Sequence, residues 1–326
     1  MKEKILSVTL AAVLFALCTS ADAQHPAKIP RIGFIAANRE GTSVKEFRRG
    51  LRGLGYSEGK NIFVEYRYSD GKDERIASLV AELVQFNVDI LVSPLPPAII
   101  AAKRASTKIP IVMVTTQDPV KIGLVDSLAR PGGNITGLTS LTRELSGKRL
   151  ELLKEMIPRL TRVGILWTTT GVPGLATAFD DYDSAARDLK ISLKSLEVHG
   201  PNPKLEELFR DAVKARVSAI IAVRVPLLIS HRKQIADFAL NNRLALMSEG
   251  SEYVEVGSLV SYSASDVENY RRAAVYVDKI IKGAKPADLP VEQAMKFELV
   301  INLKTAKQIG LTIPPNVLAR ADRIIR

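Results

Sequence analysis

Arg31-Ile32-Gly33-Phe34-Ile35, near the beginning of the chain, is matched in character by Arg162-Val163-Gly164-Ile165-Leu166 near its middle. Both segments are short apolar runs, which are typical of strands buried on both faces in a parallel sheet. Each of them opens a series in which strand and helix signals alternate in the same order. Such alternation indicates doubly wound parallel sheets, so we predict two α/β lobes. A chain of 326 residues also suits two domains of ordinary size.

The first half contains the expected strand and helix signals in turn. The alternating or apolar segments predict strands at 61–68, 88–92 and 109–114, and helices around 43–54, 76–83 and 97–106. Ser43 and Glu46 have the spacing of a capping box, which predicts the start of the first helix at Ser43.

The second half repeats this order. We expect strands at 191–198, 217–223 and 244–247, with helices at about 176–189, 205–213 and 227–241 between them. A second capping box, Ser265-x-x-Glu268, predicts the start of a further helix, and 297–301 has the pattern of a last strand.

The carboxyl-terminal part is too short for a third lobe. We therefore predict that the chain returns to the first lobe and then crosses again to the second. Lobe one would comprise residues 30–140 and 264–290, and lobe two residues 141–257 and 297–326. The two lobes would be joined by a three-crossing hinge, with crossings near 137–141, 257–263 and 291–296. Three connections of this kind can absorb a closing motion within a few residues.

Residues 1–23 have the pattern of a signal peptide. Lys2 and Lys4 precede an apolar run from Ile5 to Cys18, and Ala21-Asp22-Ala23 provides small residues for cleavage. The alternatives are a buried core helix and a lipoprotein anchored at Cys18, which Leu17 disfavours. We expect export to the periplasm, cleavage near Ala23 and no stable membrane insertion afterwards. The mature chain would then lack cysteine, which suits an oxidising compartment.

Charge and composition exclude several function classes. The formal net charge is +11, but the basic pairs are scattered and no aromatic residues alternate with them, so nucleic-acid binding is not expected. The chain has three histidines and no motif for a nucleophile–base pair, a metal or a nucleotide phosphate. We therefore predict a protein that is not an enzyme, with no cofactor and no metal.

Candidate ligand-binding residues follow the predicted strands. In open α/β sheets, ligands bind beyond the carboxyl ends of the strands, where loops of both lobes would converge. Asp118 could contact the ligand or only cap a turn, and Arg224 could hold a ligand anion or an intramolecular carboxylate. The predicted ligand-binding residues are Asn38, Ser93, Thr116, Gln117, Asp118, Thr168, Thr169, Arg224, Glu249 and Tyr262.

Three stretches of the sequence resemble a known family. They are 118–137, which contains Asp118-Pro119-Val120, then Leu145 to Glu155, and finally 283–314. The sequence resembles the ABC-transporter substrate-binding proteins whose characterised members bind aromatic amino acids. This resemblance extends over essentially the whole mature chain. It implies a type I periplasmic-binding fold and a permease in the inner membrane as partner.

The sequence predicts a solute-binding protein, and three alternative functions were weighed against it. We expect a monomeric, periplasmic solute-binding component of an ABC uptake system that captures an amino acid or small carboxylate by hinge closure. The main alternative is a sensory protein that presents its closed form to a membrane receptor. An enzyme on the same scaffold and a transcription regulator fit less well, because the chain lacks catalytic motifs and begins with a secretion signal.

Overall fold

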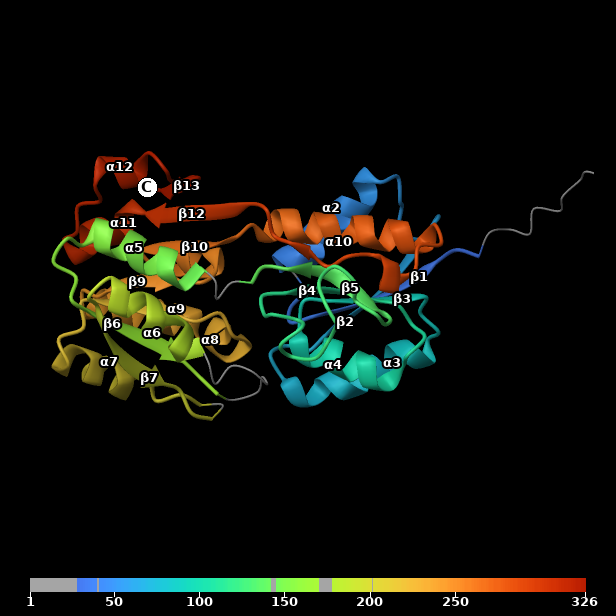
Figure 1. Cartoon of the computed structure of the whole chain (residues 1–326), viewed down its shortest axis with the longest axis horizontal. Coiled ribbons are helices and arrows are strands. Elements are labelled where there is room, and N and C mark those ends of the chain that lie inside the picture. The colour runs from blue at the N-terminus through green and yellow to red at the C-terminus, as the bar shows by residue number, and fades with distance from the viewer. Residues whose placement is uncertain (1–27, 40, 142–144, 170–177, 201) are drawn as a thin grey trace, which may run out of the picture.

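The computed structural model shows two α/β lobes side by side, joined by several connections (Figure 1). It describes residues 28–326 except 40, 142–144, 170–177 and 201, so the predicted signal peptide lies outside the described residues. The predicted fold class is confirmed, because each lobe is a mostly parallel sheet with helices interleaved along the chain. Among the described residues, no helix has both the length and the apolar character needed to cross a membrane.

Sheet one forms the centre of lobe one. Within the described part of the chain its order is β11-β5-β4-β3-β1-β2. Its strands are β1 (Arg31–Ala36), β2 (Phe63–Tyr68), β3 (Ile90–Ser93), β4 (Ile111–Thr115), β5 (Ile135–Thr139) and β11 (Glu292–Gln293). Helices α2 (Thr42–Gly53) and α10 (Asp266–Ile281) cover one face, and α3 (Ile76–Gln85) and α4 (Pro96–Ala105) cover the other. Apolar side chains of β1 enter both cores, because alternate residues of a strand point to opposite faces.

Sheet two has the order β13-β12-β10-β9-β8-β6-β7 within the described residues. Its strands are β6 (Arg162–Trp167), β7 (Ser192–Glu197), β8 (Ala219–Ala222), β9 (Ala245–Ser248), β10 (Val260–Ala264), β12 (Phe297–Asn302) and β13 (Arg323–Ile325). Strand β12 runs antiparallel to β10, so this sheet is not entirely parallel. The helices of this lobe are α5 (Ser146–Met156), α6 (Ala178–Asp188), α7 (Leu205–Lys214), α8 (Pro226–Ser230), α9 (Arg232–Asn241), α11 (Leu303–Ile309) and α12 (Pro315–Leu318).

The chain passes between the lobes three times, from β5 to α5, from β10 to α10 and from β11 to β12. The second passage comes later than the expected 257–263, because residues 260–264 form β10 of sheet two. Hydrogen bonds join the passages. Ser265 N donates to Lys296 O at 2.9 Å, and Asn269 Nδ2 donates to Ser140 Oγ at 3.2 Å. The three passages of the hinge are therefore hydrogen-bonded to one another and do not form independent segments.

Of the two predicted capping boxes, the one at Ser265 is confirmed in its N-cap hydrogen bond only, and the one at Ser43 is wrong. Ser265 is the N-cap of α10, and its side chain accepts a hydrogen bond from Glu268 N. Ser43, by contrast, lies inside α2, whose N-cap is Gly41. The expected partner Glu46 instead binds Arg271 of α10 at 2.7 Å, because α2 and α10 pack side by side.

A pH dependence follows from the pairing of Glu292 with Arg272, which joins β11 to α10 through two hydrogen bonds of 2.7 and 2.8 Å. The hydrogen bonds and charge of Arg272 lower the pKa of Glu292, although partial burial opposes this shift. A lowered folded-state pKa stabilises the protein above the unfolded pKa of about 4.3, and this contribution is lost as the pH falls through the folded value. Because solvent reaches both side chains, the contribution of this ion pair to the free energy of unfolding should not exceed about 1 kcal/mol.

We therefore expect Glu292→Gln to lower the free energy of unfolding slightly at pH 7 and by less at about pH 3. Urea unfolding at the two pH values measures this difference. The matched control is Glu74→Gln, an exposed carboxylate outside this pair, which should change stability little at either pH. A loss of stability that is the same for Glu292→Gln at both pH values would contradict the assignment.

Candidate ligand-binding site

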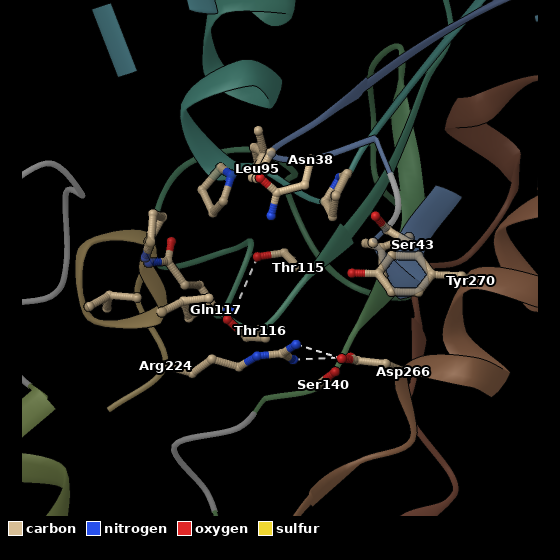
Figure 2. A pocket seen from close by; sticks show the side chains of 18 residues that line it. Asn38, Ser43, Leu95, Thr115, Thr116, Gln117, Ser140, Arg224, Asp266 and Tyr270 are labelled. Atoms are coloured by element: carbon tan, nitrogen blue, oxygen red, sulfur yellow. Dashed lines mark hydrogen bonds and ion pairs between the residues drawn. The ribbon is translucent and has the colours of Figure 1, made fainter. Parts of the chain in front are cut away.

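A cavity of about 170 Å³ lies between the two lobes (Figure 2). Lobe one contributes the loops after β1, β3 and β4 together with the beginning of α2, and lobe two contributes the loop after β8 and the beginning of α8. Ser140, Asp266 and Tyr270 belong to the hinge region and complete the wall. The cavity thus occupies the carboxyl ends of parallel strands, where ligands of open α/β sheets bind.

Four of the ten predicted residues line this cavity, namely Asn38, Thr116, Gln117 and Arg224. They come from both lobes, and Figure 2 shows all four around the same space. The other six lie outside the lining, and they are Ser93, Asp118, Thr168, Thr169, Glu249 and Tyr262.

The side chains of Ser93 and Asp118 form hydrogen bonds with backbone groups of lobe one. The Ser93 hydroxyl donates to Ile35 O at 3.0 Å and accepts from Leu95 N at 3.1 Å. The Asp118 carboxylate accepts from the backbone N–H groups of Val120 and Lys121 at 3.0 and 3.2 Å. For Asp118, the structure thus shows the turn-capping arrangement rather than a place in the cavity wall.

Three further predicted residues contact other parts of lobe two. Thr168 donates to Val198 O at 2.7 Å, and Thr169 donates to Glu197 Oε1 at 3.1 Å, so both hydroxyls face the end of β7. Tyr262, predicted at a crossing, lies instead within β10, where its ring packs against Phe297 with the ring centroids 6.2 Å apart. Pairing of β10 with β12 keeps this residue inside sheet two.

Arg224 pairs with carboxylates of the protein itself. Its Nη1 and Nη2 donate to the two oxygens of Asp266 at 3.0 and 2.5 Å, and its Nε donates to Glu252 at 2.9 Å. Burial alone would lower the pKa of Arg224, but the two carboxylates raise it well above its usual value. One positive charge therefore faces two negative charges, so this cluster carries excess negative charge, and Asp266 is its carboxylate in the cavity lining. Asp266 begins α10 of lobe one, and the ion pair consequently joins the two lobes.

Behind Arg224, a buried polar network explains the position of Glu249. One Glu249 oxygen accepts from Arg149 Nη1 at 3.1 Å and from the Tyr182 hydroxyl at 2.6 Å, and the other accepts from Arg224 N at 2.9 Å. Arg149 also donates from Nε to Tyr262 O at 2.9 Å. The pKa of Tyr182 is raised, first by burial and further by Glu249. This network connects α5, α6 and β10 with the loop that carries Arg224.

The beginning of α2 lies at the cavity wall. Gly41 is the N-cap of α2 without a side-chain cap among the described residues, and Gly41 and Ser43 both line the cavity. Helix α4 also points its first turn at the cavity, but Pro96 and Pro97 provide no N–H there. Since helix N-termini favour anions, α2 is the better position for a carboxylate.

Sequence reasoning missed Asp266 and Tyr270. Both lie on the first turns of α10, and Figure 2 shows them at the same end of the cavity. Tyr270 is 8% exposed, and burial raises the pKa of its hydroxyl. The signal that could have found them is the Ser265 capping box, because a helix that begins at an inter-lobe crossing points its first turn at the cleft. That inference requires the correct position of the crossing.

The family "ABC transporter substrate binding protein" matches residues 32–325, and the chain belongs to it. A tyrosine-binding protein of Clostridioides difficile (strain R20291) is 25% identical over 270 residues, covering 82% of this chain and 76% of the relative. A conserved domain protein of Vibrio cholerae O1 biovar El Tor strain N16961 is 28% identical with a TM-score of 0.82, covering 91% and 100% of the two chains.

An ABC domain of Streptococcus pneumoniae, solved in complex with L-Trp, shares the fold with a TM-score of 0.83. It is 24% identical, and the match covers 91% of this chain and 99% of that one. The fold is thus that of the type I periplasmic binding proteins, and members of this family bind substrates rather than transform them. Such proteins are typically extracytoplasmic and work with a permease.

Proposed function

We propose that this protein is the periplasmic solute-binding component of an ABC uptake system for an amino acid with an apolar or aromatic side chain. The observation that carries this proposal is the inter-lobe cavity, which combines a negatively charged corner at Asp266 with a helix N-terminus at Gly41 and Ser43. An amino acid carries an ammonium and a carboxylate on the same carbon, and these two features are complementary to them.

The ammonium group is assigned to Asp266. This carboxylate already has one guanidinium partner, but Arg224 shares its charge with Glu252, so a second cation is favoured at this corner. The carboxylate group is assigned to the beginning of α2, where Gly41 and Ser43 line the wall and a helix N-terminus favours an anion. The assignment differs from the simpler expectation that Arg224 binds the carboxylate, because intramolecular carboxylates already occupy its Nε, Nη1 and Nη2.

The side chain of the ligand is assigned to an apolar part of the wall. Leu95 and Pro96 of lobe one, together with Val225, Pro226 and Ile229 of lobe two, line the same cavity. Its volume of about 170 Å³ is below the roughly 300–1,000 Å³ of sites for drug-sized ligands, which suits a small metabolite. The names of two similar proteins, which refer to tyrosine and to L-Trp, support an aromatic side chain.

Capture would work by hinge closure. A ligand that contacts both lobes stabilises the closed form by its higher affinity for that form. The closed protein then docks on a permease of the inner membrane, after export directed by residues 1–23. A sensory role would use the same closure and differ only in the membrane partner.

Thermal unfolding of the protein with and without candidate ligands tests the proposal. The panel comprises L-Tyr, L-Trp, L-Phe, L-Leu, D-arabinose and D-glucose, and titration calorimetry follows for every ligand that shifts the transition. A ligand at 100 times its dissociation constant adds about 2.7 kcal/mol to the free energy of unfolding. We expect shifts with the aromatic amino acids and none with the sugars. Stabilisation by a sugar alone would overturn the amino-acid assignment.

A further inference from the structure

The Gln117 amide has an unusual environment for a buried polar group. Gln117 is 8% exposed, yet among the described residues its Oε1 has no hydrogen-bond partner. A buried acceptor without a donor destabilises a protein, and such groups are rare in native structures. Gln117 lines the inter-lobe cavity, so a bound molecule can supply the missing donor.

The backbone of Gln117 is fixed on both sides. Its N–H donates to Thr115 Oγ1 at 3.1 Å, and its carbonyl accepts from Thr139 Oγ1 at 2.8 Å. Thr115 ends β4 and Thr139 ends β5, so two adjacent strands hold this residue. A group presented from such a rigid position can discriminate between ligands, because it does not move away when its partner is missing.

The position of Gln117 in the cavity identifies the part of the ligand that it meets. In Figure 2, Gln117 lies on one side of the cavity, whereas Ser43, Asp266 and Tyr270 lie on the other. The proposed function places the ammonium and carboxylate groups at the latter side. The far end of the ligand side chain therefore reaches towards Gln117.

We infer that the Gln117 amide is a specificity determinant that selects amino acids whose side chain ends in a hydrogen-bond donor, such as the phenol O–H or the indole N–H. This inference rests on the proposed function and deepens it. A phenyl group in the same place would leave Oε1 unpaired after the cavity has closed and excluded water. Sites built to hydrogen-bond a substrate group discriminate strongly against analogues that lack this group.

Calorimetric titration of the wild-type protein with four ligands gives the first test. We expect L-Tyr and L-Trp to bind at least about tenfold more tightly than L-Phe, because an unpaired buried acceptor is avoided. The near-isosteric 4-fluoro-L-phenylalanine carries no donor and should bind like L-Phe. Equal affinity for L-Tyr and L-Phe would overturn the inference but leave the proposed function intact. If no amino acid binds, both are overturned.

The variant Gln117→Met gives the second test. It keeps the length of the side chain and removes the amide, so the ratio of L-Tyr to L-Phe affinity should fall to within about twofold. Because this ratio is taken within one variant, any general loss of folded protein cancels. Gln308→Met, which replaces an exposed glutamine of α11, should keep the wild-type ratio. An unchanged ratio in Gln117→Met would show that Gln117 contacts the common part of the ligand, which would overturn the inference.

Discussion

Asp266→Asn is expected to weaken the binding of L-Tyr at least about 30-fold. Asp266 is the carboxylate assigned to the ligand ammonium; it lies in the cavity wall and shares the charge of Arg224 with Glu252. Removing one partner of a buried, hydrogen-bonded charge pair costs about 2–5 kcal/mol, and each 1.4 kcal/mol corresponds to a tenfold change in affinity. Titration calorimetry measures the change directly.

A deaminated ligand makes this prediction specific. 3-(4-Hydroxyphenyl)propionate has the side chain and carboxylate of tyrosine but no ammonium group. Asp266→Asn should strengthen its binding, because the substitution removes a negative charge and releases two N–H donors of Arg224. The control variant Asp288→Asn replaces an exposed carboxylate and should affect neither ligand. An equal loss of affinity for both ligands would mean that Asp266 acts on the shape of the cavity and not on the ammonium.

Arg149→Met is expected to cost about 3–5 kcal/mol of folding free energy. Arg149 is 0% exposed, and Glu249 is 3% exposed, so the substitution leaves a carboxylate buried without its cationic partner. Removing one partner of a buried ion pair typically destabilises a protein by this amount, whereas replacing both partners often costs little stability. The double variant Arg149→Met/Glu249→Gln should therefore recover part of the lost stability.

The single tryptophan of the chain provides the measurement. Trp167 ends β6 of lobe two, the lobe that contains Arg149, so its fluorescence during urea unfolding reports on this lobe. The control Arg320→Met breaks the half-exposed ion pair with Glu155 and should cost at most about 1 kcal/mol. A double variant no more stable than Arg149→Met would mean that the cost does not come from an unpaired buried charge.

The two lobes could be predicted from the sequence because the signals of their strands and helices are local. The apolar runs 31–35 and 162–166 mark strands that are buried on both faces, and β1 and β6 occupy these positions. Residues 257–263, for which the sequence predicts a crossing between lobes, belong largely to lobe two. Strand β10 extends through most of this range because it pairs with both β9 and β12, and such pairings are not visible in a local pattern.

The cavity was predicted in part for the same reason. Asn38, Thr116, Gln117 and Arg224 could be selected because each follows a recognisable strand. The same rule selected Ser93 and Asp118, but Ser93 bonds to Leu95 N and to Ile35 O of β1, and Asp118 bonds to its own turn. Whether a polar side chain turns into a cleft or towards nearby backbone groups depends on geometry that strand position does not determine.

The two α/β lobes, their order along the chain and the location of a cleft at the carboxyl ends of the strands could be predicted from the amino-acid sequence. These properties follow from periodicity and from the rule that parallel strands end on the same edge of a sheet. The partners of the charged side chains in the cleft, by contrast, became visible with the folded structure. Arg224 meets Asp266, 42 residues later, because α10 returns to lobe one and begins at the hinge. Long-range packing brings these charges together, and the electrostatic character of the site depends on their pairing.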